Sequence, residues 1–432
     1  MDEKNHVDRL LDFYNKKKFD KAITTGLSLT KIYTKNPIIF NIIGLSYMNI
    51  KQYSEALSVF DELIKKFPDN AEAYINIGII HRIFGQQNRA IEFYDKSLKI
   101  NPKSYSAYLN KGNILKDMEK FELSQECYIK AISLREKPFE AYNNLGTLFE
   151  KKNQYKIAIK NYLNAIETNS SFVDAYRNLI RLYDDLDRDE EAIKFIEKLL
   201  NLTPNDKTLS HKLLSLKGEK ESPHNIVYAR ALHDARAENF DKHLKMLNYD
   251  APNKLNNLLK KELRNNFHFK NAVDLGCGTG LSGFVFRDNV DYLIGVDLSE
   301  KMLEIAKRKK IYNQLILSEV NNFLKKENRI FDLIIALDVF IYIGSLDELF
   351  SNILKITKKD SIFIFCTEDL SKGDFKLNSS GRYSHSSNYI NTLLEKNDFE
   401  LLISKKDNLR KEKNKWIEGC YFIARRKEKI VN

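Results

Sequence analysis

A period of 34 residues in the first half of the chain constrains the fold more than any other feature of the sequence. Four glycines follow this period, at Gly44, Gly78, Gly112 and Gly146. An alanine column keeps the same register at Ala56, Ala90, Ala158 and Ala192, with Ser124 in its gap, and so does an aromatic column at Phe40, Tyr74, Tyr108, Tyr142 and Tyr176. A chance amphipathic helix would not hold several columns in register, so the pattern predicts a repeat array.

These columns resemble the tetratricopeptide repeat, a helix-turn-helix unit in which small residues lie where two helices cross and an aromatic ring fills the adjacent gap. Pro68, Pro102 and Pro204 close three of the repeats. The resemblance implies an α-solenoid with five clear repeats over residues 37–206. A degenerate repeat at about 3–36, anchored by Ala22, is expected to cap its start.

An asparagine column lies two positions after the aromatic column, at Asn76, Asn110, Asn144 and Asn178. In some tetratricopeptide superhelices asparagines at this column line the concave face and hold extended peptide backbone, because an amide both donates and accepts hydrogen bonds. This implies a protein or peptide partner in the groove of the repeats. The alternative is that asparagine is simply frequent at this column and holds no ligand.

The periodicity ends at residues 207–223, a polar stretch that finishes in Ser222-Pro223 and is predicted to be a linker. The remaining residues, 224–432, alternate short apolar runs with amphipathic stretches, which favours a parallel sheet flanked by helices. We expect a helical lid over 224–268 and a sheet core over 269–432. Strands are predicted at 271–275, 292–296, 314–318, 331–336 and 361–366, with a late hairpin at about 399–405 and 418–425.

Three glycines with the spacing G-x-G-x-G, Gly276, Gly278 and Gly280, follow the first predicted strand. Their spacing differs from the dinucleotide fingerprint and from the P-loop, and on its own it is also compatible with a purely structural turn. Asp297 ends the next predicted strand, where a carboxylate can accept hydrogen bonds from both ribose hydroxyls, although a helix cap is the alternative. Together these residues predict a nucleoside cofactor at the carboxyl ends of the strands.

Residues 224–432 resemble class I methyltransferases, and the whole chain resembles the bacterial family of predicted methyltransferases that carry tetratricopeptide repeats. Beyond the glycine loop, the likeness rests on the stretches Tyr228–Asp234 with Phe240–Leu244, Asp338–Gly344, and Ser380–Ser386 with Tyr389. The resemblance implies a Rossmann-like domain with a mostly parallel seven-stranded sheet, helices on both faces, and S-adenosylmethionine as cofactor.

The expected cofactor site extends beyond the glycines and Asp297. Asp274 is placed to meet the amino group of the methionine part, and Glu319 could take the adenine amino group or be a surface acid. Tyr228 and Phe240 could fold over the cofactor as a lid, or lie on an amphipathic helix packed at the sheet edge. Cys277, Leu298 and Met302 complete the predicted cofactor-binding set.

The expected acceptor site combines Asp338 and Tyr342, which follow the fourth predicted strand, with Arg382, Tyr383 and His385. The segment from Gly381 to His385 is expected to form a loop or a helix start. It offers a guanidinium fork for a carboxylate or phosphate, a phenol, and an imidazole that could remove an acceptor proton. A structural histidine is the alternative for His385. The segment that contains Asp338, Leu333–Tyr342, lacks the Asn/Asp-Pro-Pro-Tyr/Phe motif of enzymes that methylate base amines, which counts against such an enzyme.

The composition argues against nucleic-acid binding, a disulfide framework, a metal site and a membrane span. The formal charge of +11 comes from dispersed lysine without an arginine-rich block, so a solvated surface is favoured over nucleic-acid binding. The four cysteines stand far apart and no ligand spacing is present, which predicts neither a disulfide framework nor a metal site. No apolar run is long enough for a membrane span and no signal peptide is recognisable, so a cytoplasmic protein is expected.

Three functions remain open from the sequence. The first is a methyltransferase whose repeats recruit or regulate a protein, peptide or carrier-bound acceptor. The second is a small-molecule methyltransferase whose repeats serve only assembly. The third is a repeat scaffold with a catalytically silent methyltransferase fold.

Overall fold

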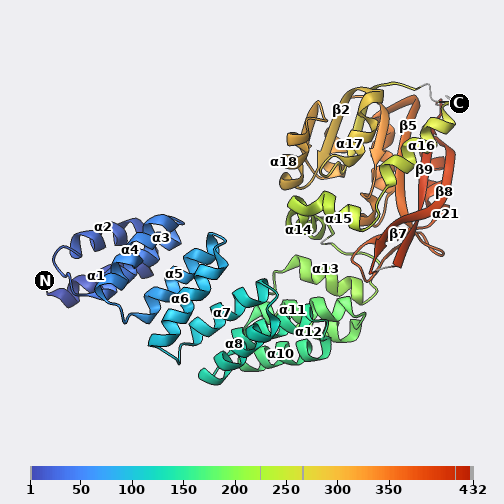
Figure 1. The fold of residues 1–432 in the computed structure, drawn as a ribbon. Coiled ribbons are helices and arrows are strands. Elements are labelled where there is room, and N and C mark those ends of the chain that lie inside the picture. The colour runs from blue at the N-terminus through green and yellow to red at the C-terminus, as the bar shows by residue number, and fades with distance from the viewer. Residues whose placement is uncertain (1, 224, 265–266, 414, 429–432) are drawn as a thin grey trace. The chain divides into compact units, whose positions relative to one another are not determined.

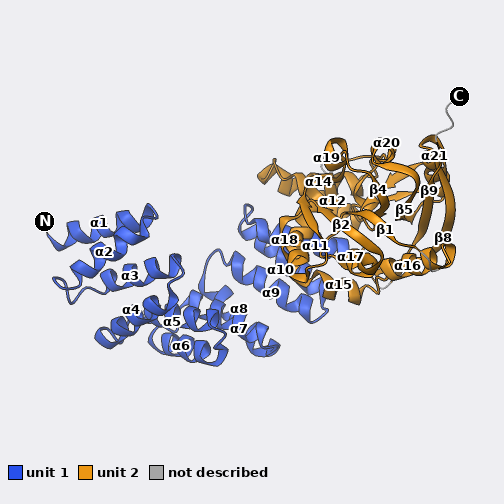
Figure 2. Cartoon of the chain, turned by 90° about the horizontal axis from the view of Figure 1, so that it is seen from above, with its two compact units in different colours: residues 1–186 blue, residues 187–432 orange. Residues whose placement is uncertain are grey.

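The computed structural model describes residues 2–223, 225–264, 267–413 and 415–428. The chain divides into two compact units, Met1–Leu186 and Asp187–Asn432 (Figure 2).

The first unit is helical: α1 to α10 pair antiparallel along the chain, two for each repeat, and α11 follows as the first helix of the next repeat (Figure 1). Its helices are α1 (Glu3–Asn15), α2 (Phe19–Leu29), α3 (Pro37–Asn49), α4 (Tyr53–Lys66), α5 (Ala71–Ile83), α6 (Gln87–Ile100), α7 (Tyr105–Asp117), α8 (Phe121–Leu134), α9 (Phe139–Lys151), α10 (Tyr155–Thr168) and α11 (Val173–Asp185). Helices α1 and α2 form the degenerate first repeat, in which Ala22 is fully buried.

The glycine column explains how closely the two helices of each repeat approach. A Cβ atom on Gly78 would lie 2.5 Å from the ring of Tyr94, and one on Gly146 would lie 2.6 Å from the ring of Tyr162. Only a residue without a side chain leaves room for the aromatic ring of the second helix. Ser124, which interrupts the alanine column, remains satisfied because its hydroxyl donates to the carbonyl of Gly112 at 2.8 Å.

The second unit is an α/β domain. Its helices are α12 (Asp189–Leu202), α13 (Lys207–Leu216), α14 (Asn225–Arg236), α15 (Phe240–Met246), α16 (Ala251–Glu262), α17 (Leu281–Phe286), α18 (Glu300–Lys309), α19 (Val320–Lys326), α20 (Asp347–Lys355) and α21 (Ser387–Lys396), with short 3₁₀ turns at Ala237–Asn239, Arg287–Asn289 and Phe340–Tyr342. Its strands are β1 (Phe269–Leu275), β2 (Val290–Asp297), β3 (Gln314–Leu317), β4 (Phe331–Ala336), β5 (Thr357–Asp369), β6 (Phe375–Leu377), β7 (Tyr383–His385), β8 (Phe399–Glu412) and β9 (Lys415–Arg426).

The nine described strands form one mixed sheet. Strands β3, β2, β1, β4 and β5 are adjacent and parallel in that order, β9 pairs antiparallel with β5, and β8 lies beyond β9. The strand order therefore reverses direction at β1, whose two neighbours are β2 and β4. Ligands of such sheets bind at this switch point, at the carboxyl ends of the strands.

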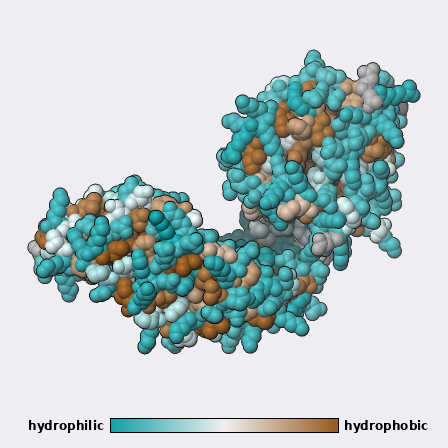
Figure 3. Space-filling model, viewed as in Figure 1, coloured by the Kyte–Doolittle hydropathy of each residue, from teal (hydrophilic) through white to brown (hydrophobic). Residues whose placement is uncertain are grey.

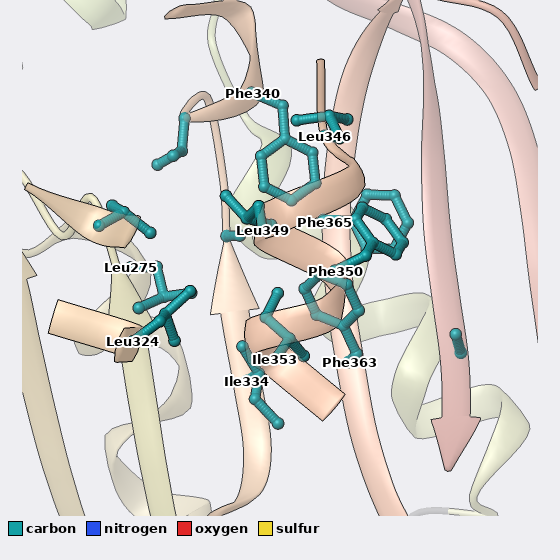
Figure 4. Packing of buried hydrophobic residues seen from close by; sticks show 14 of the residues in the cluster. Leu275, Leu324, Ile334, Phe340, Leu346, Leu349, Phe350, Ile353, Phe363 and Phe365 are labelled. Atoms are coloured by element: carbon teal, nitrogen blue, oxygen red, sulfur yellow. The ribbon is translucent and has the colours of Figure 1, made fainter. Parts of the chain in front are cut away.

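Apolar side chains cover both faces of the sheet. On one face Leu275, Ile334, Phe363 and Phe365 pack against α19 and α20, and Phe340 closes the cluster next to the end of β4 (Figure 4). On the other face Leu255 and Leu259 of α16 belong to one apolar cluster with Ala272 of β1 and Leu333 of β4. The region predicted as a lid therefore includes one helix, α16, whose apolar residues belong to the core.

The predicted α-solenoid and the mostly parallel α/β domain are both confirmed. The strands predicted from apolar runs are present, several of them longer at both ends. The expectation of a loop or helix start up to His385 is wrong for Tyr383–His385, which form β7 between β5 and β6. These strands are only three residues long, so no period-2 pattern could show in the sequence.

The stretch predicted as a linker contains α13, which is held to the turn before β7. The Nε2 atom of His211 donates to the carbonyl of Gly381 at 2.9 Å, and Lys212 Nζ donates to the carbonyl of Ser379 at 2.7 Å.

No helix among the described residues has the length and apolar character needed to cross a membrane. Hydrophilic residues dominate the face of the molecule in Figure 3, with scattered apolar positions.

Candidate functional site

The glycine loop begins where β1 ends, at the switch point of the sheet. Gly276, Gly278 and Gly280 all have positive φ angles, of 70°, 53° and 96°. At Gly276 there is also no room for a side chain, since an added Cβ would lie 2.0 Å from Cγ2 of Val339. The loop therefore needs glycine for its backbone and for its contact with the segment after β4.

Asp297, at the end of β2, holds this loop in place. One carboxylate oxygen accepts from the backbone N–H of Gly278 at 2.9 Å, and the other accepts from that of Ser299 at 2.8 Å. Burial raises the pKa of Asp297, and the nearby His233 opposes that shift. Each oxygen retains a free lone pair, so the carboxylate can still accept hydrogen bonds from a diol.

Two adjoining cavities open at the switch point, and His233, Gly276, Asp338 and Tyr342 line both of them. The first spans about 500 Å³, part of it open to solvent, and is lined further by Asp297, Leu298, Glu319 and Val320. We call it the nucleoside cavity, because it contains the carboxylate suited to a ribose. The second, of about 750 Å³, extends from the glycine loop under α14 and α15, and we call it the transfer cavity.

Several predicted cofactor residues line these cavities. Leu298 and Glu319 lie in the nucleoside cavity, while Cys277, Gly278 and Phe240 lie in the transfer cavity. Glu319 also caps α19, since its two oxygens accept from the backbone N–H groups of Asn321 and Asn322 at 2.9 and 2.8 Å.

Asp274, Met302 and Tyr228 lie outside the cavity walls. Burial raises the pKa of Asp274 to about 6, and one of its oxygens accepts from Ser282 Oγ and the Tyr312 hydroxyl at 2.6 Å each. Met302 is fully buried in α18. The Tyr228 hydroxyl donates to the carbonyl of Ser380 at 3.2 Å, so its ring faces the turn before β7.

The predicted acceptor residues divide into two groups. Asp338, Tyr342 and Arg382 line the transfer cavity. Tyr383 and His385 are buried outside its walls, where the Tyr383 hydroxyl accepts from the backbone N–H of Ser222 at 3.0 Å. His385 donates through Nε2 to the carbonyl of Gly344 at 2.9 Å, and burial lowers the pKa of its imidazole to about 4.

Sequence reasoning did not single out four further residues of the transfer cavity, His233, Arg236, His243 and Arg410. Arg410 comes from β8, far along the chain, and is the largest fully buried side chain among the described residues. The residues around Arg410 in the sequence are mostly polar, so no apolar pattern indicated that its side chain would be buried. His233 lies within a stretch that supported the resemblance, but nothing in the sequence distinguished it from a helix-surface histidine.

Hydrogen bonds fasten the helices above the transfer cavity to the cofactor loop. Asp241 at the start of α15 accepts from Thr279 Oγ1 at 2.5 Å and from Lys309 Nζ at 2.6 Å. Asp234 on α14 accepts from Ser299 Oγ at 2.5 Å, next to Asp297. Helices α14 and α15 therefore form a lid over the switch point.

In the first unit every residue of the predicted asparagine column donates a hydrogen bond within the repeats, to a group outside the column. Asn76, Asn144 and Asn178 each donate to an asparagine of the preceding repeat, namely Asn41 at 3.3 Å, Asn113 at 2.9 Å and Asn143 at 3.0 Å. Asn110 donates to the carbonyl of Ser106 in its own helix at 2.9 Å. All four residues of the column are half-buried, so part of each amide faces solvent.

A glycine loop at the switch point, an acidic residue at the end of the second strand and a helical lid define a Rossmann-like domain that binds a nucleoside cofactor. Comparison with known families makes this assignment specific. Residues 268–417 match a family described as a methyltransferase domain. Tetratricopeptide repeat families match residues 43–105, 105–138 and 144–207. The chain thus carries tetratricopeptide repeats followed by a methyltransferase domain.

Two curated relatives are similar to the second half of the chain. A probable S-adenosylmethionine-dependent methyltransferase of Saccharomyces cerevisiae, CRG1, is 27% identical over 31% of this chain and 49% of the relative. The 18S rRNA (guanine-N(7))-methyltransferase RID2 of Arabidopsis thaliana is 28% identical over 18% of this chain and 26% of the relative. The chain thus spans half or less of these relatives. The domain match and the relatives indicate S-adenosylmethionine as the cofactor.

Among solved structures, MamA from Desulfovibrio magneticus RS-1 is similar to this chain with 19% identity and a TM-score of 0.35. The match covers 39% of this chain and 96% of MamA.

Proposed function

We propose that the protein is an S-adenosylmethionine-dependent methyltransferase whose repeats recruit or regulate the methyl acceptor. The observation that supports this most is the joint placement of the glycine loop, Asp297 and two adjoining cavities at the switch point. A silent domain would not need the glycine loop and Asp297 to border a cavity, as Gly276, Gly278 and Asp297 do.

S-adenosylmethionine, when bound, supplies a methyl group on a positively charged sulfonium. Asp297 offers lone pairs to the ribose hydroxyls, and the backbone of Gly276 and Gly278 allows close approach of the methionine part. Asp338 lines both cavities, so its carboxylate would be available to a cationic group of the bound cofactor. The lid, fastened through Asp234 and Asp241, excludes water and positions the reactants, which is the main requirement for an in-line displacement.

For the acceptor, two candidates are supported by different observations. Tetratricopeptide arrays typically bind proteins or peptides, and the half-exposed asparagine column offers amides for that purpose, which favours a protein, peptide or carrier-bound acceptor. The transfer cavity, which lies beneath the lid, favours a small-molecule acceptor, with the repeats used for assembly.

Transfer of a labelled methyl group tests the proposal. The full-length protein is incubated with methyl-labelled S-adenosylmethionine and a cell lysate that is then separated into protein and small-molecule fractions. Label above a no-enzyme control is expected in one fraction, and that fraction decides between the two acceptors. Label in neither fraction, from protein that is folded, would contradict methyltransferase activity.

The role of the repeats needs a separate comparison. Asn110→Ala combined with Asn144→Ala is expected to lower labelling of the protein fraction while leaving cofactor affinity unchanged. A loss of cofactor affinity in this double variant would contradict the assigned roles of the two units.

A further inference from the structure

Four buried polar atoms without a hydrogen-bond partner among the described residues belong to side chains that line the transfer cavity. They are His233 Nδ1, Asp338 Oδ1, Arg382 Nε and Arg410 Nη1. Buried polar atoms in folded proteins nearly always have partners, because leaving one unpaired is costly. Their convergence on one cavity indicates that a polar ligand completes it.

Two of the four atoms are guanidinium donors that the fold holds side by side. Oε1 of Glu412 bonds both side chains, accepting from Arg410 Nε at 3.0 Å and pairing with Arg382. Glu368 pairs with another nitrogen of Arg410. Neither glutamate lines the cavity. With the glutamates bonded to the other nitrogens, Arg382 Nε has no hydrogen-bond partner among the described residues, and Arg410 Nη1 has only a long ion pair with Asp338.

The charges that face the transfer cavity are mostly positive. Arg236, an exposed residue of α14, adds a third guanidinium to those of Arg382 and Arg410, and Asp338 is the anion among the described lining residues. Asp338 Oδ1 lies 3.5 Å from Arg410 Nη1. Burial lowers the pKa of both lining histidines, His233 and His243.

Most of the remaining wall is apolar, with contributions from Leu244, Leu247, Tyr249 and Pro252 of the lid region and Leu337 after β4. The carboxylates of Asp338, Glu368 and Glu412 balance the charges of the three guanidinium groups. The site therefore offers donor groups without an excess of positive charge, which suits a singly charged carboxylate better than a doubly charged phosphate monoester.

We propose that the methyl acceptor is a small carboxylic acid with an apolar body, whose carboxylate binds Arg382 and Arg410. This inference rests on the proposed function, since the same cavity must also admit the methionine part of the cofactor beside Gly276 and Gly278. Planar guanidinium groups match the two oxygens of a carboxylate, and the apolar wall takes the rest of the molecule.

Binding of simple acids to the full-length protein saturated with S-adenosylhomocysteine tests the proposal. The probes are octanoate and phenylacetate, each compared with its uncharged amide by calorimetric titration. Both acids are expected to bind more tightly than their amides. Arg382→Gln is expected to lower the affinity for the acids by about 10-fold, since one charge-assisted hydrogen bond is lost, and to leave the affinity for the amides unchanged.

Arg425→Gln is the matched control, because Arg425 pairs with Glu400 at the surface away from the cavity and should keep the preference for acids. Arg382→Lys keeps the charge but loses the planar fork, so it should weaken binding of the acids less than Arg382→Gln does. It serves as the test if Arg382→Gln is poorly folded. Equal binding of acids and amides by the wild type would overturn the proposal.

A second comparison separates an acceptor carboxylate from the carboxylate of the cofactor itself. Arg382→Gln should bind S-adenosylhomocysteine and 5′-methylthioadenosine, which lacks the amino acid part, as the wild type does. Selective weakening of S-adenosylhomocysteine would assign Arg382 to the cofactor and overturn the proposal. Failure of the wild type to bind S-adenosylhomocysteine at all would instead contradict the proposed function.

Discussion

Among single residues, Gly276 has the least room for change. Its φ of 70° and the 2.0 Å approach of an added Cβ to Val339 combine backbone strain with a steric clash. Gly276→Ala is expected to lower the free energy of unfolding by about 2 to 4 kcal/mol, and to weaken S-adenosylmethionine binding by at least about 10-fold, because the loop must shift away from the cofactor. Chemical denaturation and calorimetric titration measure the two effects.

Gly373→Ala is the control for the backbone part of this effect. Gly373 has a φ of 86° but nothing within 4 Å of an added Cβ, so its substitution should cost only about 1 kcal/mol and leave cofactor binding unchanged. Equal costs at both positions would show that the contact with Val339 is not the cause.

His385 gives a pH dependence of stability with a defined sign. Its pKa is lowered to about 4 in the folded protein, so the unfolded chain takes up the proton first as pH falls. The free energy of unfolding is therefore unaffected by His385 above the ordinary histidine pKa of about 6.5. It falls as pH drops from there toward 4, by roughly 3 kcal/mol at most. In His385→Gln, which can donate to Gly344 but cannot be protonated, unfolding free energy should fall less steeply over this range. Parallel pH profiles would contradict this.

Residue-level prediction from the sequence succeeded where a residue type is tied to a position in a motif. The glycines and Asp297 follow strands with recognisable patterns, so their placement at the switch point could be predicted. Arg410 and His233 reach the transfer cavity through the pairing of β8 with β9 and the docking of α14, which no local pattern records.

At the scale of elements, the lid depends on few polar contacts. Asp241 connects α15 to Thr279 of the glycine loop and to Lys309 of α18. Asp241→Ala should weaken cofactor binding by about 10-fold, mainly through faster dissociation, because the lid loses its contacts with the loop. Stopped-flow or surface-based kinetics measure this rate. Asp288→Ala, at an exposed position of the same unit, should have no effect.

The elements themselves show where sequence patterns fail. Long strands such as β1, β2 and β4 are buried on both faces and appear as apolar runs, so they were predicted. Strands β6 and β7 are short, and they form only because β5 extends beyond the core and offers Glu368 and Asp369 as pairing positions. Arg382 enters the transfer cavity from the turn between these two strands.

For the whole molecule, the separate cores of the two units predict two steps of thermal unfolding. Clusters such as that around Phe40 and Phe60 lie wholly within the first unit, and those of the sheet lie wholly within the second. S-adenosylhomocysteine at about 100 times its dissociation constant should stabilise only the second unit, by about 2.7 kcal/mol. Scanning calorimetry with and without ligand measures this. A shift of both transitions would contradict independent stabilisation.

The switch point of the second unit is expected to bind S-adenosylmethionine through the glycine loop and Asp297. Calorimetric titration of the full-length wild type and of Asp297→Ala tests it most directly. We predict one cofactor per chain in the wild type and affinity at least about 10-fold weaker in the variant, because the carboxylate no longer accepts from the ribose or holds Gly278. No binding by the wild type at high micromolar cofactor, or equal affinity in both proteins, would contradict the claim.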